Sequence, residues 1–316
     1  MYRILLLGST GKIGKYVLND LLQYKGFDVR LLLRKPVENE TPCVSFFQGD
    51  ITAIDSLREG IAWCDVVVNC AGVVSYKAQD HSILNQINVD GTKNILETCT
   101  KFSKPLLHTS SAVVYGSTKS PLAQSENDND SNGYLPGYAL SKLTADQLIQ
   151  RSSVKSIILR PSTMISSYGS TFSKLLALYR NGFRAGLHGG ASFVKPDDIS
   201  QVFGRAILYL LNNDFQNVIF NIGGNNILIK EVFDFFRQHE FRKTYYISSA
   251  LLHTLSLVND SFLLPVFKKS ILTRENYKTG SLFTYLNSDK AKQELGYTIT
   301  PFSDAAKNIL NNANHG

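Results

Sequence analysis

Tyr138 and Lys142, in the segment "YALSK", are the residues whose types and spacing most directly suggest chemistry. They are four residues apart, so on a helix they share one face. A phenol has a pKa near ~10 and is a poor acid or base at neutral pH. A lysine ammonium beside it, together with an oxidised nicotinamide ring, would lower that pKa and let the phenol exchange a proton with a substrate oxygen during hydride transfer. A lone YxxxK pair more often belongs to a surface helix, so the surrounding sequence must decide.

A serine hydroxyl is expected beside this pair. Ser111 ends an expected strand in the segment "HTSSAVVYG". Its hydroxyl can hold the same substrate oxygen that the phenol would protonate.

Three glycines near the start of the chain indicate a phosphate-binding turn. Gly8, Gly11 and Gly14 lie in "GSTGKIG", between the apolar run "RILLL" and a helical pattern. The usual dinucleotide fingerprint is GxGxxG, and this one is GxxGxxG, but the mechanics are similar. Glycines permit a tight turn and close backbone approach, and the helix N-terminus faces a pyrophosphate. The alternative is a tight strand-to-helix turn that holds no ligand.

The end of the second expected strand indicates which dinucleotide binds. NAD sites carry an acidic residue there, but "DVRLLL" runs into Arg34 and Lys35. A guanidinium can grip a 2′-phosphate, so NADP(H) is preferred over NAD(H), unless Arg34 is simply a solvated surface residue. Asp50 follows the third strand and is expected to meet the adenine edge, or else to cap the next segment.

The elements that position these residues alternate along the chain. Continuous apolar strands that alternate with helices predict an α/β fold, a Rossmann doubly wound parallel sheet covered on both faces. Such a fold places ligands at the carboxyl ends of its strands. Strands are expected at 3–8, 28–34, 43–50, 65–72, 105–112 and 155–161, and helices at 14–26, 56–64, 83–101 and 138–153.

Composition excludes several other classes of protein. The 316 residues carry a net charge of +7, but no basic cluster exceeds two residues, so no nucleic-acid partner is expected. The four cysteines show no metal-binding spacing, and we expect reduced thiols, no metal and a cytoplasmic location. The opening apolar run leads straight into glycines and is expected to be a buried strand, not a signal peptide.

Six motifs in order resemble one known family. The set "GSTGKIG", "NCAG", "NVDGT", "TSSAVVYG", "YALSK" and "LRPS" is similar to the extended short-chain dehydrogenase/reductases, which include NAD-dependent epimerases and dehydratases. The turn at Arg34 looks closest to dihydroflavonol-reductase-like and hydroxysteroid-dehydrogenase-like members. The resemblance implies an NADP-binding Rossmann domain at 1–162, to which 197–224 return, and a smaller C-terminal substrate-binding lobe at 163–196 and 225–316.

The resemblance also assigns roles to single residues. It implies a triad of Ser111, Tyr138 and Lys142, with Asn88 supporting the proton path by bending its helix around a water. Taken alone, Asn88 is equally a satisfied amide inside a helix. Lys142 would bond the nicotinamide ribose, Ala71 and Gly72 would pass close to the cofactor, and Pro161 onward would flank the carboxamide. The expected cofactor-binding residues are Gly8, Thr10, Gly11, Lys12, Ile13, Gly14, Arg34, Lys35, Asp50, Ile51, Ala71, Gly72, Tyr138, Lys142, Pro161 and Thr163.

One departure from the family bears on the substrate. Many sugar-nucleotide epimerases have a segment like RPxNVYGP, but here Thr163 stands in place of the asparagine. The stretches 231–241 and 250–267 are rich in Phe and Leu and are expected to form a helical pair, either as a structural lobe or as an apolar substrate pocket. Membrane contact is not expected, because Asn259 and Asp260 interrupt the second stretch. Against an apolar substrate, four basic residues could hold a diphosphate: Lys174, Arg180, Arg184 and Lys195.

The sequence therefore predicts an NADP(H)-dependent oxidoreductase that interconverts a carbonyl and a secondary alcohol of a small-molecule substrate. The alternatives are a nucleotide-sugar epimerase, dehydratase or reductase, and a cofactor-binding regulator without turnover. Helices 83–101 and 138–153 are expected to form a homodimer interface, with Ile95 and Leu148 on their outward faces.

Overall fold

A seven-stranded parallel sheet forms the larger part of the molecule. The computed structural model describes residues 1–35, 44–128, 137–258, 277 and 280–312. Every pairing in this sheet is parallel. In spatial order its strands are β10 (Asn217–Ile222), β6 (Ser156–Pro161), β5 (Leu106–Thr109), β4 (Val66–Asn69), β1 (Tyr2–Leu7), β2 (Phe27–Leu33) and β3 (Phe46–Gln48).

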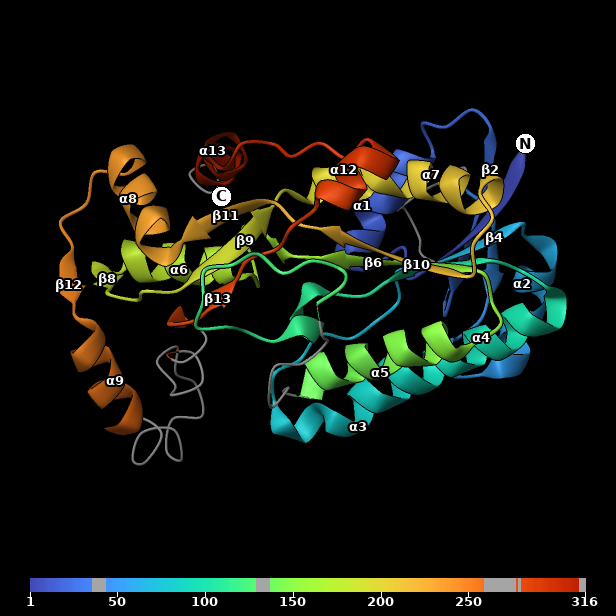
Figure 1. Cartoon of the computed structure of the whole chain (residues 1–316), viewed down its shortest axis with the longest axis horizontal. Coiled ribbons are helices and arrows are strands. Elements are labelled where there is room, and N and C mark those ends of the chain that lie inside the picture. Colours follow the sequence, from blue (N-terminus) through green and yellow to red (C-terminus); the bar gives the residue numbers. More distant parts are fainter. Residues whose placement is uncertain (36–43, 129–136, 259–276, 278–279, 313–316) are drawn as a thin grey trace.

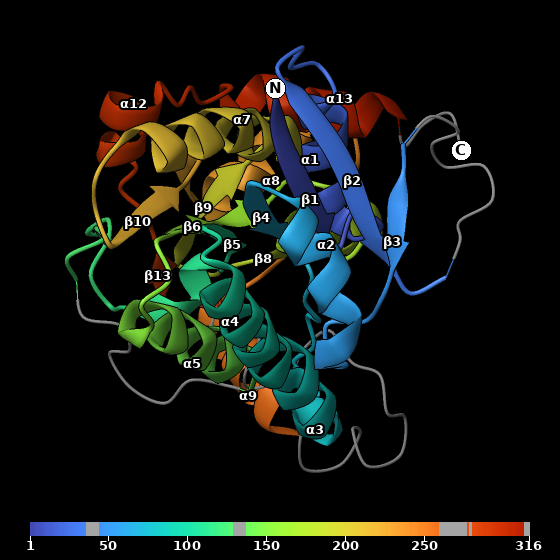
Figure 2. The same ribbon diagram turned by 90° about the vertical axis from the view of Figure 1, so that its right-hand side faces the viewer.

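Helices cover both faces of the sheet (Figures 1 and 2). The two cores divide the side chains of β1 by alternation: Ile4 and Leu6 pack toward α1 and α7, while Leu5 and Leu7 face the opposite core. The expected Rossmann doubly wound fold is thus confirmed. One face carries α1 (Lys12–Leu21) and α7 (Pro196–Asn212), and the other carries α2 (Arg58–Trp63), α4 (Gly91–Phe102) and α5 (Gly137–Arg151).

A second, smaller group of elements lies beyond the carboxyl ends of the strands (Figure 1). Its core is aromatic, with Phe172, Phe193 and Phe236 fully buried. A four-stranded sheet joins β7 (Thr163–Met164), β9 (Gly190–Val194), β11 (Asn225–Leu228) and β13 (Phe283–Thr284), and a two-stranded sheet joins β8 (Phe183–Ala185) and β12 (Tyr245–Ile247). The helices are α6 (Thr171–Arg180), α8 (Ile229–His239), α9 (Ser249–Val258), α12 (Asp289–Leu295), which packs nearer the large sheet, and α13 (Phe302–Asn312).

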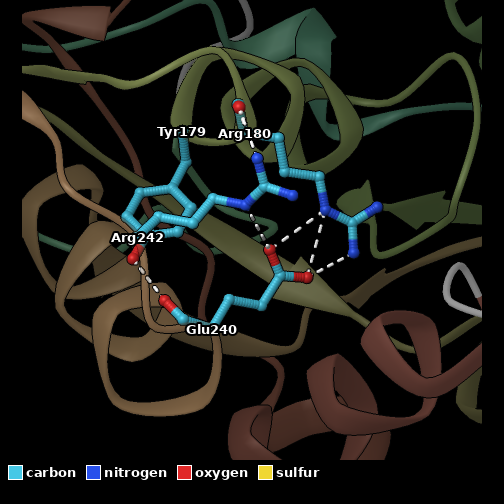
Figure 3. A network of polar contacts seen from close by, with 4 residues as sticks. All are labelled: Tyr179, Arg180, Glu240 and Arg242. Carbon is cyan, nitrogen blue, oxygen red and sulfur yellow. Dashed lines mark hydrogen bonds and ion pairs between the residues drawn. The ribbon is translucent and has the colours of Figure 1, made fainter.

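A polar network ties α6 to the end of α8 (Figure 3). The Arg180 guanidinium pairs with the Glu240 carboxylate, and the Tyr179 hydroxyl donates to the Glu240 carbonyl at 2.6 Å. Arg242 Nη1 donates to the Arg180 carbonyl at 3.0 Å. Because the Arg180 guanidinium already pairs with Glu240, it is less suited to bind the diphosphate of a substrate.

Three expectations about the helices need correction. Ile95 does not face outward: it is fully buried against the sheet, because it lies on the same face of α4 as Leu96 and Cys99. Leu148 is only half-buried and packs against that same core. The expected helix 83–101 is instead α3 (His81–Leu84), a π-helical turn (Asn85–Asp90) and α4.

The expected helical pair in the lobe is α8 and α9, with β12 between them. The rest of the second stretch, 259–267, lies outside the described residues. Within the described part of the chain, none of the helices combines the length and apolar character that a membrane span requires.

Candidate active site

Tyr138 and Lys142 lie one turn apart at the start of α5, at the carboxyl end of β5. Both are buried, with 7% and 5% of their surface exposed. Lys142 Nζ donates to the carbonyl of Thr109, the last residue of β5, at 2.9 Å. The sheet edge therefore holds the ammonium in place, and the helix presents the phenol beside it.

Burial controls the charges of this pair in the protein alone. Burial raises the pKa of Tyr138 well above its usual range, the nearby Tyr76 raises it further, and a hydrogen bond with Ser111 opposes both. Burial also lowers the pKa of Lys142. Burial therefore favours the protonated phenol in the protein alone, and the lowering of its pKa by Lys142 together with a bound nicotinamide ring stays a prediction.

Ser111 lies next to the phenol, as the sequence predicts. It follows β5 and caps the short 3-10 helix Ala112–Tyr115, with its Oγ accepting from the Val113 N–H at 3.4 Å. Its side chain is close enough to Tyr138 to lower the pKa of the phenol, against the effect of burial. The structure thus brings together all three residues of the expected triad.

Asn88 sits in the π-helical turn before α4 and is buried. Its Oδ1 accepts from the Val73 N–H at 2.8 Å, and its Nδ2 donates to the Val73 carbonyl at 3.0 Å and to Ser141 Oγ at 2.9 Å. Ser141 in turn donates to the Tyr138 carbonyl at 2.8 Å. Single π turns inside helices are frequent at functional sites. Asn88 therefore joins α5 to the segment after β4, and its expected part in a proton path stays a prediction.

Sequence reasoning missed a buried ion pair behind this site. Arg160 Nε donates to Asp146 Oδ2 at 3.0 Å, and neither side chain is exposed. Asp146 is one turn beyond Lys142 on α5, and burial raises its pKa to about 6 even though Arg160 opposes the shift. One signal in the sequence pointed to Asp146, its spacing of four residues from Lys142, which itself follows Tyr138 by four. No signal pointed to the pairing, because Arg160 lies on a different element, β6.

The glycine turn is built for close backbone approach. Gly8 has φ +78°, and a Cβ on it would lie 2.5 Å from the Ala71 nitrogen. A Cβ on Gly14 would lie 2.0 Å from the Gly8 carbonyl oxygen. The next helix begins after Gly11, which has no side chain to cap it. This turn can therefore present backbone N–H groups to an anion.

Two orphaned hydroxyls support a fit to a dinucleotide. Ser9 Oγ, in the glycine turn, and Ser162 Oγ, just after β6, are buried without a hydrogen-bond partner among the described residues. Buried hydroxyls normally have partners. Sequence reasoning missed both serines, although both lie beside residues that it selected. Gly72 lies beside the expected catalytic residues, since a Cβ there would be 3.2 Å from both Lys142 Nζ and Asn88 Oδ1.

The remaining expected cofactor residues fall into two groups. Arg34 and Lys35 are exposed at the end of β2, as a contact to a 2′-phosphate requires, and Thr10 and Lys12 are exposed in the glycine turn. Lys12 Nζ lies 3.4 Å from the carbonyls of Tyr168 and Gly169.

The other group is held by the protein itself. Asp50 Oδ1 accepts from both the N–H and the hydroxyl of Thr52, but Asp50 is not the helix N-cap of the alternative interpretation, because the next helix, Ile54–Leu57, is capped at Ala53. Ile51 is buried in the core, and its carbonyl accepts from Asn94 at 2.9 Å. Because the Ile51 side chain is buried, this residue can contact a ligand mainly through its backbone. Ile13 packs partly into the core, Pro161 ends β6, Thr163 begins β7, and Ala71 accompanies Gly72 after β4.

Comparison with known proteins gives a consistent group of relatives. The family model described as the NAD dependent epimerase/dehydratase family matches residues 4–223. A sterol-4-alpha-carboxylate 3-dehydrogenase from Dictyostelium discoideum is 23% identical over 94% of this chain and 96% of its own length. A farnesyl dihydroquinoline-oxide ketoreductase from Stigmatella aurantiaca is 23% identical over 93% and 91%. Human 3 beta-hydroxysteroid dehydrogenase type 7 is 27% identical over 58% and 54%.

Solved structures share the fold over the whole chain. The crystal structure of gox2253 has a TM-score of 0.81 at 23% identity, covering 100% of this chain and 99% of its own. A UDP-glucuronic acid 4-epimerase from Bacillus cereus, solved with a UDP sugar and NAD, has a TM-score of 0.75 at 19% identity and covers 99% of both chains. These identities support a common fold.

Proposed function

Because the chain belongs to the NAD dependent epimerase/dehydratase family, we propose that it is an NADP(H)-dependent oxidoreductase that interconverts a carbonyl and a secondary alcohol. The observation that carries this proposal is the buried group of Tyr138, Lys142 and Ser111 at the carboxyl end of β5. A phenol held protonated there, beside an ordered hydroxyl and an ammonium, is suited to give a proton to a substrate oxygen.

Each residue of the group has a separate task in this proposal. Tyr138 donates its proton to the carbonyl oxygen during reduction and takes it back during oxidation. Ser111 donates a hydrogen bond to the same oxygen, and Lys142 supplies positive charge that stabilises the phenolate. When bound, a nicotinamide dinucleotide supplies or accepts the hydride. The glycine turn would hold its pyrophosphate and Lys142 its ribose.

We propose an apolar substrate in preference to a nucleotide sugar. Two of the four basic residues that could hold a diphosphate are engaged, Arg180 with Glu240 and Lys195 with Asp197 at 3.2 Å. Thr163 replaces the asparagine of many epimerases. Two relatives that match over more than nine-tenths of their length are named for a sterol and for a farnesylated ring compound.

A melting-temperature panel tests this substrate class. In the presence of NADP+, an apolar ketone such as trans-2-decalone should raise the melting temperature by several degrees, while UDP-glucose and dTDP-glucose should leave it unchanged. The reason is that burying apolar surface contributes ~25 cal/mol per Å² without a nucleotide contact. A shift with a nucleotide sugar, and none with the ketones, would reverse the choice in favour of the epimerase.

Arg34 is predicted to set the preference for NADPH over NADH. Arg34→Asp should weaken NADPH binding by about tenfold to a hundredfold, since a charge-assisted phosphate contact contributes ~1.5–3 kcal/mol. NADH, which lacks the 2′-phosphate, should bind the variant at least as well as the wild type. Lys93→Asp, an equal charge reversal at an exposed position of α4, is the control and should change neither constant. Equal dissociation constants of the wild type for the two coenzymes would refute the preference.

A homodimer is also predicted, through the helices 83–101 and 138–153. With Ile95 buried, the exposed apolar residues of this region are Ile83 and Leu140, at 39% and 48%. Light scattering at micromolar concentration should give a mass near twice 35.2 kDa. A mass of one chain at that concentration would count against the dimer.

A further inference from the structure

Tyr76 lies directly beside Tyr138, at the edge of the candidate active site. It lies in the segment Cys70–Lys77, which leaves the carboxyl end of β4 in the middle of the large sheet. Its ring meets the Tyr138 ring edge-on, with 5.7 Å between centroids and 74° between planes. The two rings differ in access, because Tyr76 is 57% exposed and Tyr138 only 7%.

The backbone on both sides of Tyr76 is fixed by hydrogen bonds. Asn88 holds Val73 by both its N–H and its carbonyl, at 2.8 and 3.0 Å. On the nearer side, Ser75 Oγ donates to Asp80 Oδ2 at 2.5 Å and accepts from the Lys77 N–H at 3.3 Å. The backbone that carries the exposed Tyr76 ring is therefore held in place, and the buried Asn88 contributes two of the hydrogen bonds that hold it.

Tyr76 has one large, exposed apolar neighbour in its own segment. The next large side chain toward β4 is Val74, which is 64% exposed. An aromatic ring face offers a rigid surface on which a saturated or aromatic ring can pack, and such contacts add to the effect of area burial alone. An extended flexible chain makes poorer use of a flat rigid wall, because it loses more conformational freedom on binding.

We propose that Tyr76 determines substrate specificity: its ring forms one wall of the substrate site, against which the rings of a fused-ring apolar ketone or alcohol pack while the oxygen meets Tyr138. This inference rests on the proposed function, since it names the substrate class of the same site. The ring, and not its hydroxyl, provides the wall.

The inference is tested by the binding of two ketones that each contain ten carbon atoms. trans-2-Decalone has two fused rings, and 2-decanone is acyclic. With NADP+ neither can be reduced, so calorimetry gives the dissociation constant of each without turnover. Tyr76→Ala should weaken trans-2-decalone by about tenfold and 2-decanone by less than about twofold. Tyr76→Phe, which keeps the ring, should leave both within about twofold.

Controls separate a local wall from general damage. Tyr2→Ala removes an exposed tyrosine, 38%, from the amino end of β1, away from the carboxyl ends of the strands, and should change neither constant. The dissociation constant of NADP+ should be the same in every variant. Equal weakening of the two ketones by Tyr76→Ala, an unchanged constant for trans-2-decalone, or an effect of Tyr76→Phe as large as that of Tyr76→Ala would each overturn the inference.

Turnover with NADPH then distinguishes this inference from the proposed function. If Tyr76→Ala weakens the binding of trans-2-decalone but the wild type never reduces this ketone, the proposed reaction is wrong and the proposed role of Tyr76 is supported. If the wild type reduces trans-2-decalone and Tyr76→Ala leaves the KM unchanged, the proposed reaction is supported and the proposed role of Tyr76 is wrong. If the wild type binds neither ketone, both the wall and the apolar substrate class are wrong.

Discussion

Replacing Tyr138 by phenylalanine is expected to lower kcat by about 10²–10⁴-fold, the usual contribution of general acid–base catalysis. The ring stays in its buried position on α5, and only the hydroxyl that would give the proton is lost. The dissociation constant of NADPH should therefore stay within about twofold of the wild type. Stopped-flow or steady-state kinetics with any ketone from the melting-temperature panel measures the loss.

Tyr2→Phe is the matched control for that variant. It removes the same hydroxyl from a tyrosine that is 38% exposed at the amino end of β1, and kcat should be unchanged. Retention of more than about a tenth of the wild-type kcat by Tyr138→Phe would exclude Tyr138 as the proton donor.

The second large effect concerns stability. Arg160→Met should lower the free energy of unfolding by ~3–5 kcal/mol, because it leaves the Asp146 carboxylate buried without its partner. Arg160 also lies over the Tyr115 ring, 4.8 Å from its centroid, so a cation–π contact is lost as well. Urea unfolding monitored by circular dichroism gives the change.

The loss should depend on pH in a defined direction. Burial already raises the pKa of Asp146 to about 6 from 3.8, and without the arginine, which lowers it, the pKa rises further. A carboxyl group with a folded pKa above its unfolded value favours the folded state when protonated, so stability falls as pH rises through that range. The variant should therefore be closer to the wild type at pH 5 than at pH 8.

Arg58→Met provides the comparison on the surface. Arg58 pairs with Asp55 at 2.8 Å, but both side chains are more than half exposed, at 53% and 79%. Exposed pairs contribute about 0–1 kcal/mol, so this variant should unfold almost as the wild type does at both pH values. A destabilisation by Arg160→Met no larger than that of Arg58→Met would show that the buried pair does not hold the sheet to α5.

The sequence predicted the parts of the site that are local in the chain. The glycine turn follows from three glycines between an apolar strand and a helix, and the structure confirms close backbone approach there. Tyr138 and Lys142 share a helix face because of their spacing, and Ser111 joins them because β5 ends beside the start of α5. The alternation of strands with helices was enough to predict the parallel sheet, since its central strands, β1 and β4, are mainly apolar and buried.

What the sequence did not predict depends on contacts between distant segments. Asp146 meets Arg160 only because α5 packs on β6, and no periodicity relates the two residues. Tyr76 lies in a segment without regular structure, where neither helical nor strand spacing operates. Ile95 was expected to face outward because helical spacing gives the faces of a helix but not which one meets the sheet.

Transfer of deuterium is the most direct test of the central claim, that a carbonyl is reduced at Tyr138 with a nicotinamide coenzyme. The wild type is incubated with trans-2-decalone and with NADPH in which both hydrogens at nicotinamide C4 are deuterium, and the product is analysed by mass spectrometry and NMR. The account predicts one deuterium at the carbon that bore the oxygen, one coenzyme oxidised for each alcohol formed, and almost no product with Tyr138→Phe. No deuterated alcohol from any ketone, together with interconversion of UDP sugars without net consumption of coenzyme, would contradict it.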